Sequence, residues 1–569
     1  MPSSTNAQKP GALAALAVFF ERRALVMLGL GFASGLPNLL IFDTLSAWLR
    51  DAGLSLEVIG FFSLATLAYS FKFLWAPLVD RAKIPGLTAW LGHRRSWMLV
   101  CQALIILGLW LVAGGNPAAN LGAMALCAVF VGFSSATQDI VVDAWRIEAA
   151  PDEKQGAMAA AYQWGYRLAM IVAGAAPLVL AEAFSWNLSY AVMACLMGVG
   201  VLAVLAAPRE TAHEIRPIHA AGVASRPGLE IPEWVARLAL FGLGALILGS
   251  GLAGDAGLIG GALKALGQAD AGEALKAAWT AKPWGVFLQV AGVLAGGVVI
   301  VLAARPIPGA TTRPGVYLAA ALGDPLKDFF TRYDKTAGLI LALICLYRLS
   351  DFVLNIMNPF YLDLGFSKLE IAEVRKVFGV IMSMLGVFAG GYAVARLGLI
   401  RALLIGAFAG PLSNLVFAWL AVQGPQLSAL FVAIGVDNVA SGFSGTCLIA
   451  YMSSLTSEGF TATQYALFSS LYSLPGKLLA SQSGRIVEAA AASAQAGGPA
   501  AALAGLFVRL PPEAFAAAVA KSGVPAAALG VGYVTFFFYS AGIGAVGIVL
   551  AFLVAARQPK DEPAEASPA

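Results

Sequence analysis

The sequence predicts an all-α membrane protein built from two six-helix halves and two inserted helices, about 14 transmembrane helices in total. Of its 569 residues, 59% are hydrophobic and only 12% are charged, and the mean hydropathy is +0.79. Soluble domains carry roughly twice that proportion of charged residues. The hydrophobic residues form blocks of about 20, the length that an α-helix needs to cross a bilayer. Helices satisfy their backbone hydrogen bonds internally, so lipid favours them for these blocks.

The hydrophobic blocks divide the chain into six spans, a linker, two spans, a second linker and six further spans. The expected spans lie near 24–49, 57–79, 96–114, 119–146, 157–182, 187–207, 233–253, 284–304, 337–362, 370–395, 400–422, 427–453, 463–487 and 531–556. The expected parts are an N-terminal segment (1–23), an N-terminal half (24–207), a linker (208–232), two extra helices (233–304), a second linker (305–335), a C-terminal half (336–556) with an external loop (488–530), and a tail (557–569).

Basic residues concentrate on one side of this predicted topology. That side carries Arg22, Arg23, Arg81, Lys83, Arg94, Arg95, Arg209, Arg216, Arg396, Arg401, Arg557 and Lys560. The opposite loops, near 50–56, 115–120, 363–369 and 423–427, carry few basic residues. Cytoplasmic loops of membrane proteins carry the excess of Lys and Arg. We therefore expect both termini and both linkers to lie in the cytoplasm.

The two halves share an internal repeat. Gly132-Phe133-Ser134 recurs as Gly442-Phe443-Ser444, and at the same offset Tyr162 matches Tyr472 and Arg167 matches Lys477. Two parallel six-helix halves are the architecture of the major facilitator superfamily, whose substrate site lies at the membrane midplane between them. The repeat thus resembles that superfamily and implies its fold.

A second sign of two related halves comes from their Gly- and Arg-containing cytoplasmic loops. Asp80-Arg81 precede Arg94-Arg95 in the first half, and residues 390–401 hold three glycines and two arginines at the equivalent place in the second. These loops resemble a signature of the same superfamily, in which an Asp at a helix end pairs with Arg and holds one conformation. The resemblance implies a conformational latch formed by Asp80, Arg81, Arg94 and Arg95.

Acidic residues inside the predicted spans are candidates for proton coupling. An ionised side chain at the centre of a membrane helix costs about 2.5–3.5 kcal/mol, so each needs a partner or a water-filled cavity. Asp139 and Asp143 stand four apart on one helical face, and Arg146 is spaced to reach back to Asp143. Desolvation makes a carboxylate bind protons more readily, and a nearby cation opposes this. Asp43, Asp139 and Asp143 are therefore the candidates that bind and release a proton.

Other charged residues lie nearer the ends of the spans. Arg348 and Asp351 are three apart, which is a spacing typical of an ion pair on one helical face. Structural ion pairing is the favoured interpretation for charges in such positions, namely Arg146, Asp351, Arg485 and Glu488.

A substrate site is expected where the repeat places cations in both halves. Arg167 and Lys477 fall within spans at equivalent positions, and cations facing each other across the pseudo-twofold axis would hold an anionic substrate by charge-assisted hydrogen bonds. Tyr162 and Tyr166 place aromatic rings near Arg167, which suits a sugar joined to a carboxylate. The substrate-binding candidates are Gln138, Tyr162, Tyr166, Arg167, Asn355, Asn358 and Lys477.

Three runs together resemble the AmpG muropeptide permeases of Gram-negative bacteria: GFASGLP (31–37), SATQDIVVDAWR (135–146) and YQWGYR (162–167). RLSDFVLNIMNPFYLDLGFS (348–367) and SLYSLPGKLLASQSGRIVE (470–488) extend the resemblance into the second half. Such permeases import GlcNAc-1,6-anhydroMurNAc-peptides across the inner membrane. The resemblance implies proton-driven import for peptidoglycan recycling, no bound cofactor, a monomer, and a link to β-lactamase induction.

Other functions stay open at the level of sequence. Eukaryotic acetyl-CoA transporters of the same wider family carry a similar Gln-Asp-Ile…Val-Asp run, so an acetyl-CoA or other anionic-solute transporter is the main alternative. A drug exporter is expected to have a more apolar site with fewer paired charges. A membrane enzyme is disfavoured, because His93, His213 and His219 lie in predicted loops and form no metal-spaced cluster. A scaffold without transport is disfavoured by the buried charges.

Overall fold

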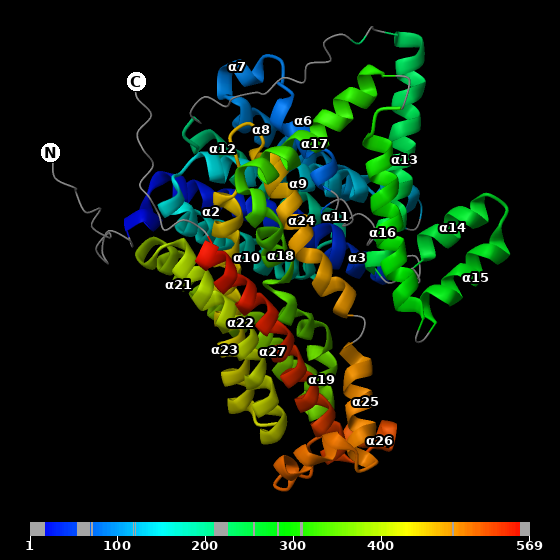
Figure 1. The fold of residues 1–569 in the computed structure, drawn as a ribbon, viewed down its shortest axis with the longest axis vertical. Helices are drawn as coiled ribbons and strands as arrows, with labels where there is room; N and C mark the ends of the chain where they lie inside the picture. Colours follow the sequence, from blue (N-terminus) through cyan, green and yellow to red (C-terminus); the bar gives the residue numbers. More distant parts are fainter. Residues whose placement is uncertain are drawn as a thin grey trace, which may run out of the picture.

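The computed structural model describes residues 17–53, 69, 72–117, 119, 121–209, 223, 226–253, 256–281, 284–307, 311–480 and 483–557. The regular structure of these residues is helical, and long helices pack side by side (Figure 1). Within this described part, ten helices are long and apolar enough to cross a membrane. The prediction of an all-α membrane protein is therefore confirmed.

The first helix of the N-terminal half is interrupted by a π-helical turn. α2 (Arg22–Leu39) continues through η2 (Leu40–Thr44) into α3 (Leu45–Asp51). Single π turns inside α-helices are frequent at functional sites, and η2 contains Asp43. The expected span 57–79 lies largely outside the described residues. The half continues with η4 (Lys72–Leu74), α6 (Ala76–Arg81), α7 (Leu87–Leu91), α8 (His93–Ala113), α9 (Leu121–Glu148), α10 (Asp152–Ala183), α11 (Trp186–Leu196) and α12 (Gly198–Ala206).

The C-terminal half has a similar succession of helices. α9 and α23 (Leu427–Ser454), which carry the repeated Gly-Phe-Ser residues, are both 28 residues long. The first helix is again interrupted, because the 3₁₀ segment η6 (Leu349–Ile356) separates α18 (Ala337–Leu346) from α19 (Met357–Leu364). The half also contains α20 (Lys368–Glu373), η7 (Val374–Phe378), α21 (Gly379–Leu397), α22 (Leu399–Gln423), α24 (Thr461–Ala480) and α27 (Ala526–Arg557).

The two inserted helices stand together beside the halves (Figure 1). α13 (Pro227–Ala253) and α16 (Gly285–Ala304) pack on each other. A Cβ added at Gly296 would lie 2.5 Å from the carbonyl oxygen of Gly244, so small residues allow this close approach, as is common in membranes. The polar stretch between them forms two helices, α14 (Gly257–Ala265) and α15 (Ala269–Thr280), which project sideways.

The stretch 488–530, expected as an external loop, is mostly helical. It contains the end of α25 (Ser483–Gln495), η8 (Pro499–Phe507), α26 (Ala516–Ser522) and the start of α27. Alanine has the highest helix propensity, yet the alanines of this segment form no continuous hydrophobic block of membrane-spanning length. α25 packs closely on α27, since a Cβ added at Gly532 of α27 would lie 2.7 Å from the carbonyl oxygen of Val487.

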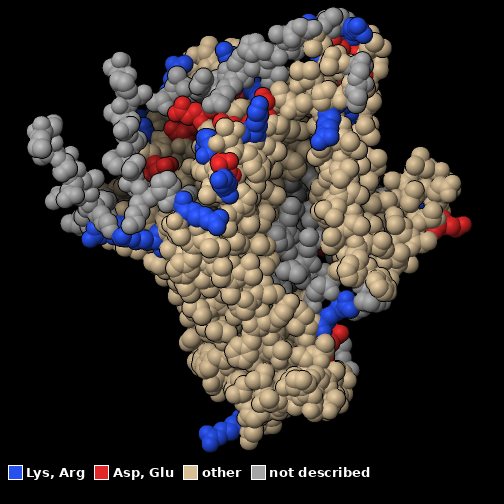
Figure 2. Space-filling view, viewed as in Figure 1, with Lys and Arg blue, Asp and Glu red and all other residues tan. Residues whose placement is uncertain are grey.

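The second linker, predicted over 305–335, contains a helix of its own. α17 (Arg313–Tyr333) buries Ala321, Pro325 and Phe329, which recur every four residues. That spacing places them on one face, so α17 is an amphipathic helix. Charged side chains gather at the end of the molecule where α6, α7 and α17 lie, and few appear on the opposite end in this view (Figures 1 and 2). We call this the basic end.

The packing of α2 on α10 gives a first testable prediction. A Cβ added at Gly165 would lie 1.9 Å from the carbonyl oxygen of Leu28, so Gly165→Ala must separate the two helices. We expect a loss of about 1–3 kcal/mol of stability, measured as a lower unfolding midpoint of the purified protein. Gly174→Ala on the same helix is the control, because its nearest neighbour is Leu39 Cδ1 at 4.0 Å. Equal midpoints for the two variants would contradict the prediction.

Candidate functional site

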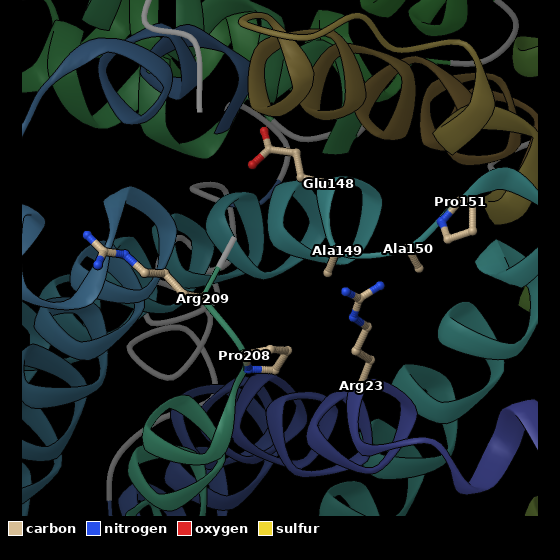
Figure 3. A pocket seen from close by; sticks show the side chains of 7 residues that line it. All are labelled: Arg23, Glu148, Ala149, Ala150, Pro151, Pro208 and Arg209. Carbon is tan, nitrogen blue, oxygen red and sulfur yellow. The ribbon is translucent and has the colours of Figure 1, made fainter. Parts of the chain in front are cut away.

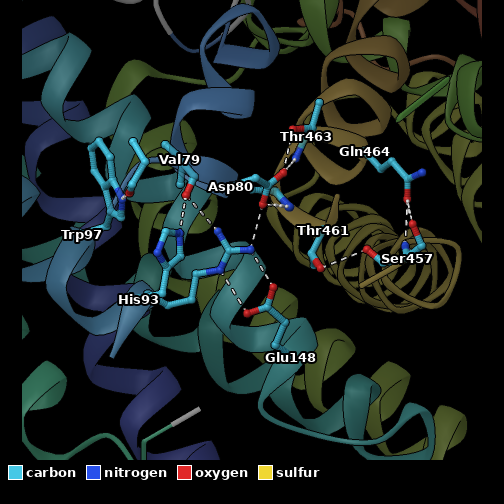
Figure 4. Close-up of polar contacts among 12 residues, drawn as sticks. Val79, Asp80, His93, Trp97, Glu148, Ser457, Thr461, Thr463 and Gln464 are labelled. Atoms are coloured by element: carbon cyan, nitrogen blue, oxygen red, sulfur yellow. Dashed lines mark hydrogen bonds and ion pairs between the residues drawn. The ribbon is translucent and has the colours of Figure 1, made fainter. Parts of the chain in front are cut away.

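A buried arginine links three elements at the basic end. Arg94, in the first turn of α8, is 0% exposed. Its Nε and Nη2 donate to the two carboxylate oxygens of Glu148 at 3.0 and 2.6 Å, and Nη2 also donates to Oδ1 of Asp80 at 2.8 Å (Figure 4). The paired geometry with Glu148 is the one that guanidinium and carboxylate groups favour. Arg94 thus joins the ends of α6 and α9.

Asp80 in turn binds the C-terminal half. Its Oδ2 accepts hydrogen bonds from the Thr463 backbone N–H at 2.9 Å and from Thr463 Oγ1 at 2.6 Å. Its Oδ1 accepts from the Ala462 N–H at 3.1 Å. These are the first residues of α24, where unpaired N–H groups and the helix dipole favour an anion. We call Asp80, Arg94, Glu148, Ala462 and Thr463 the latch cluster.

The other two expected latch residues point elsewhere. Arg81 Nη2 lies 4.0 Å from Asp324 on α17, and its guanidinium lies over the ring of Phe460. Arg95 donates to the carbonyl oxygens of Val204 and Leu205 at the end of α12. The placement of Arg95 in the latch is therefore wrong in this structure, because consecutive side chains of a helix point about 100° apart.

Further contacts close the basic end between the halves. Arg146 Nη1 donates to Ser453 Oγ at 2.8 Å, and its guanidinium lies over the Tyr465 ring. Where α10 crosses α21, a Cβ added at Gly156 would lie 2.6 Å from Val394 Cβ. The two halves therefore meet directly at this end.

Two of the proton-coupling candidates, Asp139 and Asp143, are buried in the N-terminal half. Asp143 lies 3.6 Å from Lys72 Nζ and 3.5 Å from Arg146 Nη2, which confirms the expected pairing with Arg146. Asp139 is 8% exposed, and its Oδ1 has no hydrogen-bond partner among the described residues. The side chain of Asp43 lies outside the described residues. Asp139 thus has fewer charged and hydrogen-bonding partners than Asp143 among the described residues.

The aromatic and cationic candidates for substrate binding lie together on α10. The rings of Tyr162 and Tyr166 are 6.1 Å apart, and Tyr166 Oη accepts a hydrogen bond from Asn38 Nδ2 at 2.6 Å. Arg167 is half-buried and forms no hydrogen bond or ion pair with the described residues. α10 also packs on the C-terminal half, since Gln163 donates to Thr446 and Trp164 donates to Met384. This face of α10 is therefore at the interface of the halves.

A cation from the C-terminal half approaches this face, but it differs from the expected one. The side chain of Lys477 lies outside the described residues, whereas Arg348 comes near Gln163, which lies on the same helix as Arg167. A Cβ added at Gly445 would lie 3.0 Å from Arg348 Nη1 and 3.9 Å from Gln163 Oε1. Arg348 and Gln163 of α10 therefore lie on the same side of Gly445. The expected pairing of Arg348 with Asp351 is confirmed at 2.5 Å.

Three further candidates are placed differently from the expectation or not described. Gln138 is 0% exposed inside α9, so it does not line an open site in this conformation. Asn358 is exposed and accepts a hydrogen bond from Arg375. The side chain of Asn355 lies outside the described residues.

Two charged groups of the C-terminal half, Arg348 and Asp437, were not among the predicted substrate-binding or proton-coupling residues. Arg348 Nη2 donates to Ser441 at 2.8 Å in addition to Asp351, and Asp437 on α23 accepts from Ser413 at 3.1 Å. Each is a charged residue inside an apolar span, which is the sequence feature that could have identified it. The internal repeat did not identify them, because it pairs Arg167 with Lys477.

A cavity of about 170 Å³ at the basic end does not belong to this interface. Its lining comes from the N-terminal half and the start of the following linker: Arg23, Glu148, Ala149, Ala150, Pro151, Pro208 and Arg209 (Figure 3). Sites for drug-sized ligands usually measure roughly 300–1,000 Å³. The cavity is thus too small for a bulky solute and does not lie between the halves.

A family model and curated relatives match most of this chain. The model of the Major Facilitator Superfamily matches residues 24–479. The putative transporter AmpG 4 of Rickettsia felis is 30% identical over 474 residues, which cover 83% of this chain and 91% of that protein. The anhydromuropeptide permease of Escherichia coli K12 is 31% identical over 477 residues, covering 83% and 76%. The solved structure of the proton:xylose symporter XylE aligns over 96% of both chains with 10% identity and a TM-score of 0.49.

The helical fold and the matched family model define a multi-pass membrane transporter and not an enzyme. The extent and identity of the matches then place it more narrowly. The chain belongs to the AmpG-type permeases of the major facilitator superfamily.

Proposed function

We propose that this protein imports anhydromuropeptides from the periplasm to the cytoplasm for peptidoglycan recycling, as a proton-coupled transporter of the bacterial inner membrane. The observation that carries the proposal is that α10 presents Arg167 beside two tyrosines at the interface, where Arg348 of the opposite half comes near Gln163 of the same helix. The 31% identity with a protein named anhydromuropeptide permease supports this choice of cargo.

The chemistry of the interface suits such a cargo. An anhydromuropeptide joins a disaccharide to a peptide that carries free carboxylates. Arg167 offers a guanidinium without an acidic partner among the described residues, and guanidinium groups bind carboxylates in a paired geometry. Tyr162 and Tyr166 offer ring faces for the sugars, and Asn38 offers an amide.

Alternating access is supported by the way the basic end is closed. The latch cluster joins the halves through hydrogen bonds to one carboxylate, so a rigid-body movement of the halves can break it as a unit. The positive-inside rule assigns the basic end to the cytoplasm. Under the proposal, this structure is closed on that side, and a substrate enters from the periplasm.

Proton coupling is assigned to Asp139, whose Oδ1 has no hydrogen-bond partner among the described residues. We expect Asp139→Asn to reduce proton-driven accumulation to the level of protein-free liposomes, because the amide cannot exchange a proton. Substrate counterflow without a proton gradient is expected to persist. Asp270→Asn, at an exposed position of α15, is the matched control. Proton-driven uptake that survives in Asp139→Asn would show that another group carries the proton.

The cargo is tested by uptake of labelled anhydromuropeptide into proteoliposomes with an acidic exterior. We expect uptake that collapses when a protonophore dissipates the gradient. Counterflow with unlabelled competitors separates the main alternative, an acetyl-CoA or other anionic-solute transporter. Acetyl-CoA competing as well as anhydromuropeptide would overturn the proposed cargo, because a highly anionic nucleotide needs no sugar-binding face.

A further inference from the structure

The inserted helices are tied to the start of α17 by a buried polar group. On α13, Arg237 Nε pairs with Glu233 at 2.7 Å, and its Nη1 donates to the carbonyl oxygens of Ala303 and Arg305, the latter at 2.8 Å. Glu233 also accepts a hydrogen bond at 2.7 Å from Thr312, the N-cap of α17. Thus α13 holds both the end of α16 and the beginning of α17.

The other end of α17 binds the loop that leads into α24. Asp328 Oδ2 accepts from Ser457 Oγ at 2.8 Å and from Gln464 Nε2 at 3.0 Å. Gln464 Nε2 also donates to the carbonyl oxygen of Pro325 at 2.9 Å, and Arg332 donates to that of Leu455 at 3.0 Å. Burial opposes ionisation of Asp328, but hydrogen bonds from Ser457 and Gln464 and the Arg332 charge hold the pKa of its carboxyl below the ordinary value.

These contacts fix the part of α24 that receives Asp80. Gln464 directly follows Thr463, and its Oε1 accepts the Ser457 backbone N–H at 2.8 Å (Figure 4). The first turn of α24 is therefore held both by its own loop and by α17. On the opposite side, Arg81 of the N-terminal half lies 4.0 Å from Asp324 of α17. α17 thus bridges the two halves next to the latch cluster.

We propose that α17 is a clasp for the closed basic end, in which Asp328 and Gln464 are positioning residues that hold the start of α24 in place for Asp80. The inserted helices α13 and α16 anchor this clasp through Glu233. The inference rests on the proposed alternating access of the halves. It gives the inserted pair a role in the conformational equilibrium.

A single cysteine reports the opening of the basic end in the full-length protein. The reporter is Val394→Cys, in a background whose five native cysteines are replaced. Val394 is 2% exposed in this structure and faces Gly156 of the other half. The reporter's rate of alkylation by a maleimide, in purified protein without substrate, measures how often the halves separate. We expect Asp328→Asn and Gln464→Leu each to raise this rate on the order of tenfold, the change expected for losing a charged hydrogen bond.

Matched controls separate opening of the clasp from general loosening. Lys327→Gln changes an exposed charge one residue away on α17 and is expected to leave the rate unchanged. A second reporter, Ala407→Cys, is buried inside the C-terminal half and is expected to react slowly in every variant. Faster alkylation of both reporters in Asp328→Asn would indicate unfolding and overturn the clasp.

Two further variants distinguish failure of the clasp from failure of the proposed function. If the alkylation rate of the Val394→Cys reporter rose in Asp80→Asn but not in Asp328→Asn, the clasp would be overturned and the latch cluster would stand. If the alkylation rate rose in neither variant, the proposed latch itself would be overturned. A rise in Asp328→Asn without one in Glu233→Gln would overturn the anchoring role of α13 and α16.

Discussion

Replacing Arg94 by methionine is expected to lower the stability of the protein by about 3–5 kcal/mol, the typical cost of leaving buried charges without their partner. Arg94 is 0% exposed and is shared by Asp80 and Glu148. Methionine fills similar space but leaves the buried carboxylate of Asp80 and the partly buried carboxylate of Glu148 without this partner. The measurement is equilibrium unfolding of the purified variant in mixed micelles.

The adjacent arginine supplies a matched control for this experiment. Arg95 donates hydrogen bonds to the carbonyl oxygens of Val204 and Leu205 at the end of α12, at 3.1 and 3.3 Å. Arg95→Met is expected to cost about 1 kcal/mol, the typical worth of a hydrogen bond or a helix-end cation. If Arg95→Met destabilised the protein as much as Arg94→Met, the central position of Arg94 would be refuted.

Arg167→Gln is expected to weaken substrate recognition more than any other single change at the interface of the halves. Removing a charge that binds a substrate carboxylate costs about 2 kcal/mol or more, which corresponds to a rise in KM of roughly 30-fold. Arg348 already pairs with Asp351, so it compensates only in part. Initial rates of anhydromuropeptide uptake over a range of concentrations provide the measurement.

A second arginine in a membrane helix controls for the loss of charge. Arg401 is exposed in the first turn of α22, away from α10, and Arg401→Gln is expected to leave KM unchanged. An unchanged KM in Arg167→Gln would exclude this guanidinium from the substrate site. A fall in maximal rate alone would instead assign it to the conformational step.

Pairs close in sequence were predictable because one helix sets their distance. Spacings of three residues correctly indicated the ion pairs Asp143–Arg146 and Arg348–Asp351. The repeat correctly pointed to α9 and α23 as corresponding helices of equal length. Most of the helices within 488–530 were not predicted for the opposite reason, because the alanines of this stretch form no hydrophobic block and its helices depend on packing against α27.

Contacts between the halves were beyond local reasoning. Asp80 binds Thr463, 383 residues away, and no spacing rule relates residues at that separation. The choice between Arg94 and Arg95 likewise depends on which side of α8 faces α6 and α9. The role of α17 depends on its docking to the start of α24.

The sequence by itself determined that the chain is a helical membrane protein with paired halves, because hydrophobic block length and repeat follow directly from bilayer thickness and chain order. It also determined which helices carry charged residues, whose burial in a membrane costs free energy and therefore points to a functional role. Only the tertiary structure decided which charges meet. Three-dimensional packing joins Asp80 to α24 and brings Arg348 toward α10, because side-chain direction and the docking of distant helices are properties of the assembled fold.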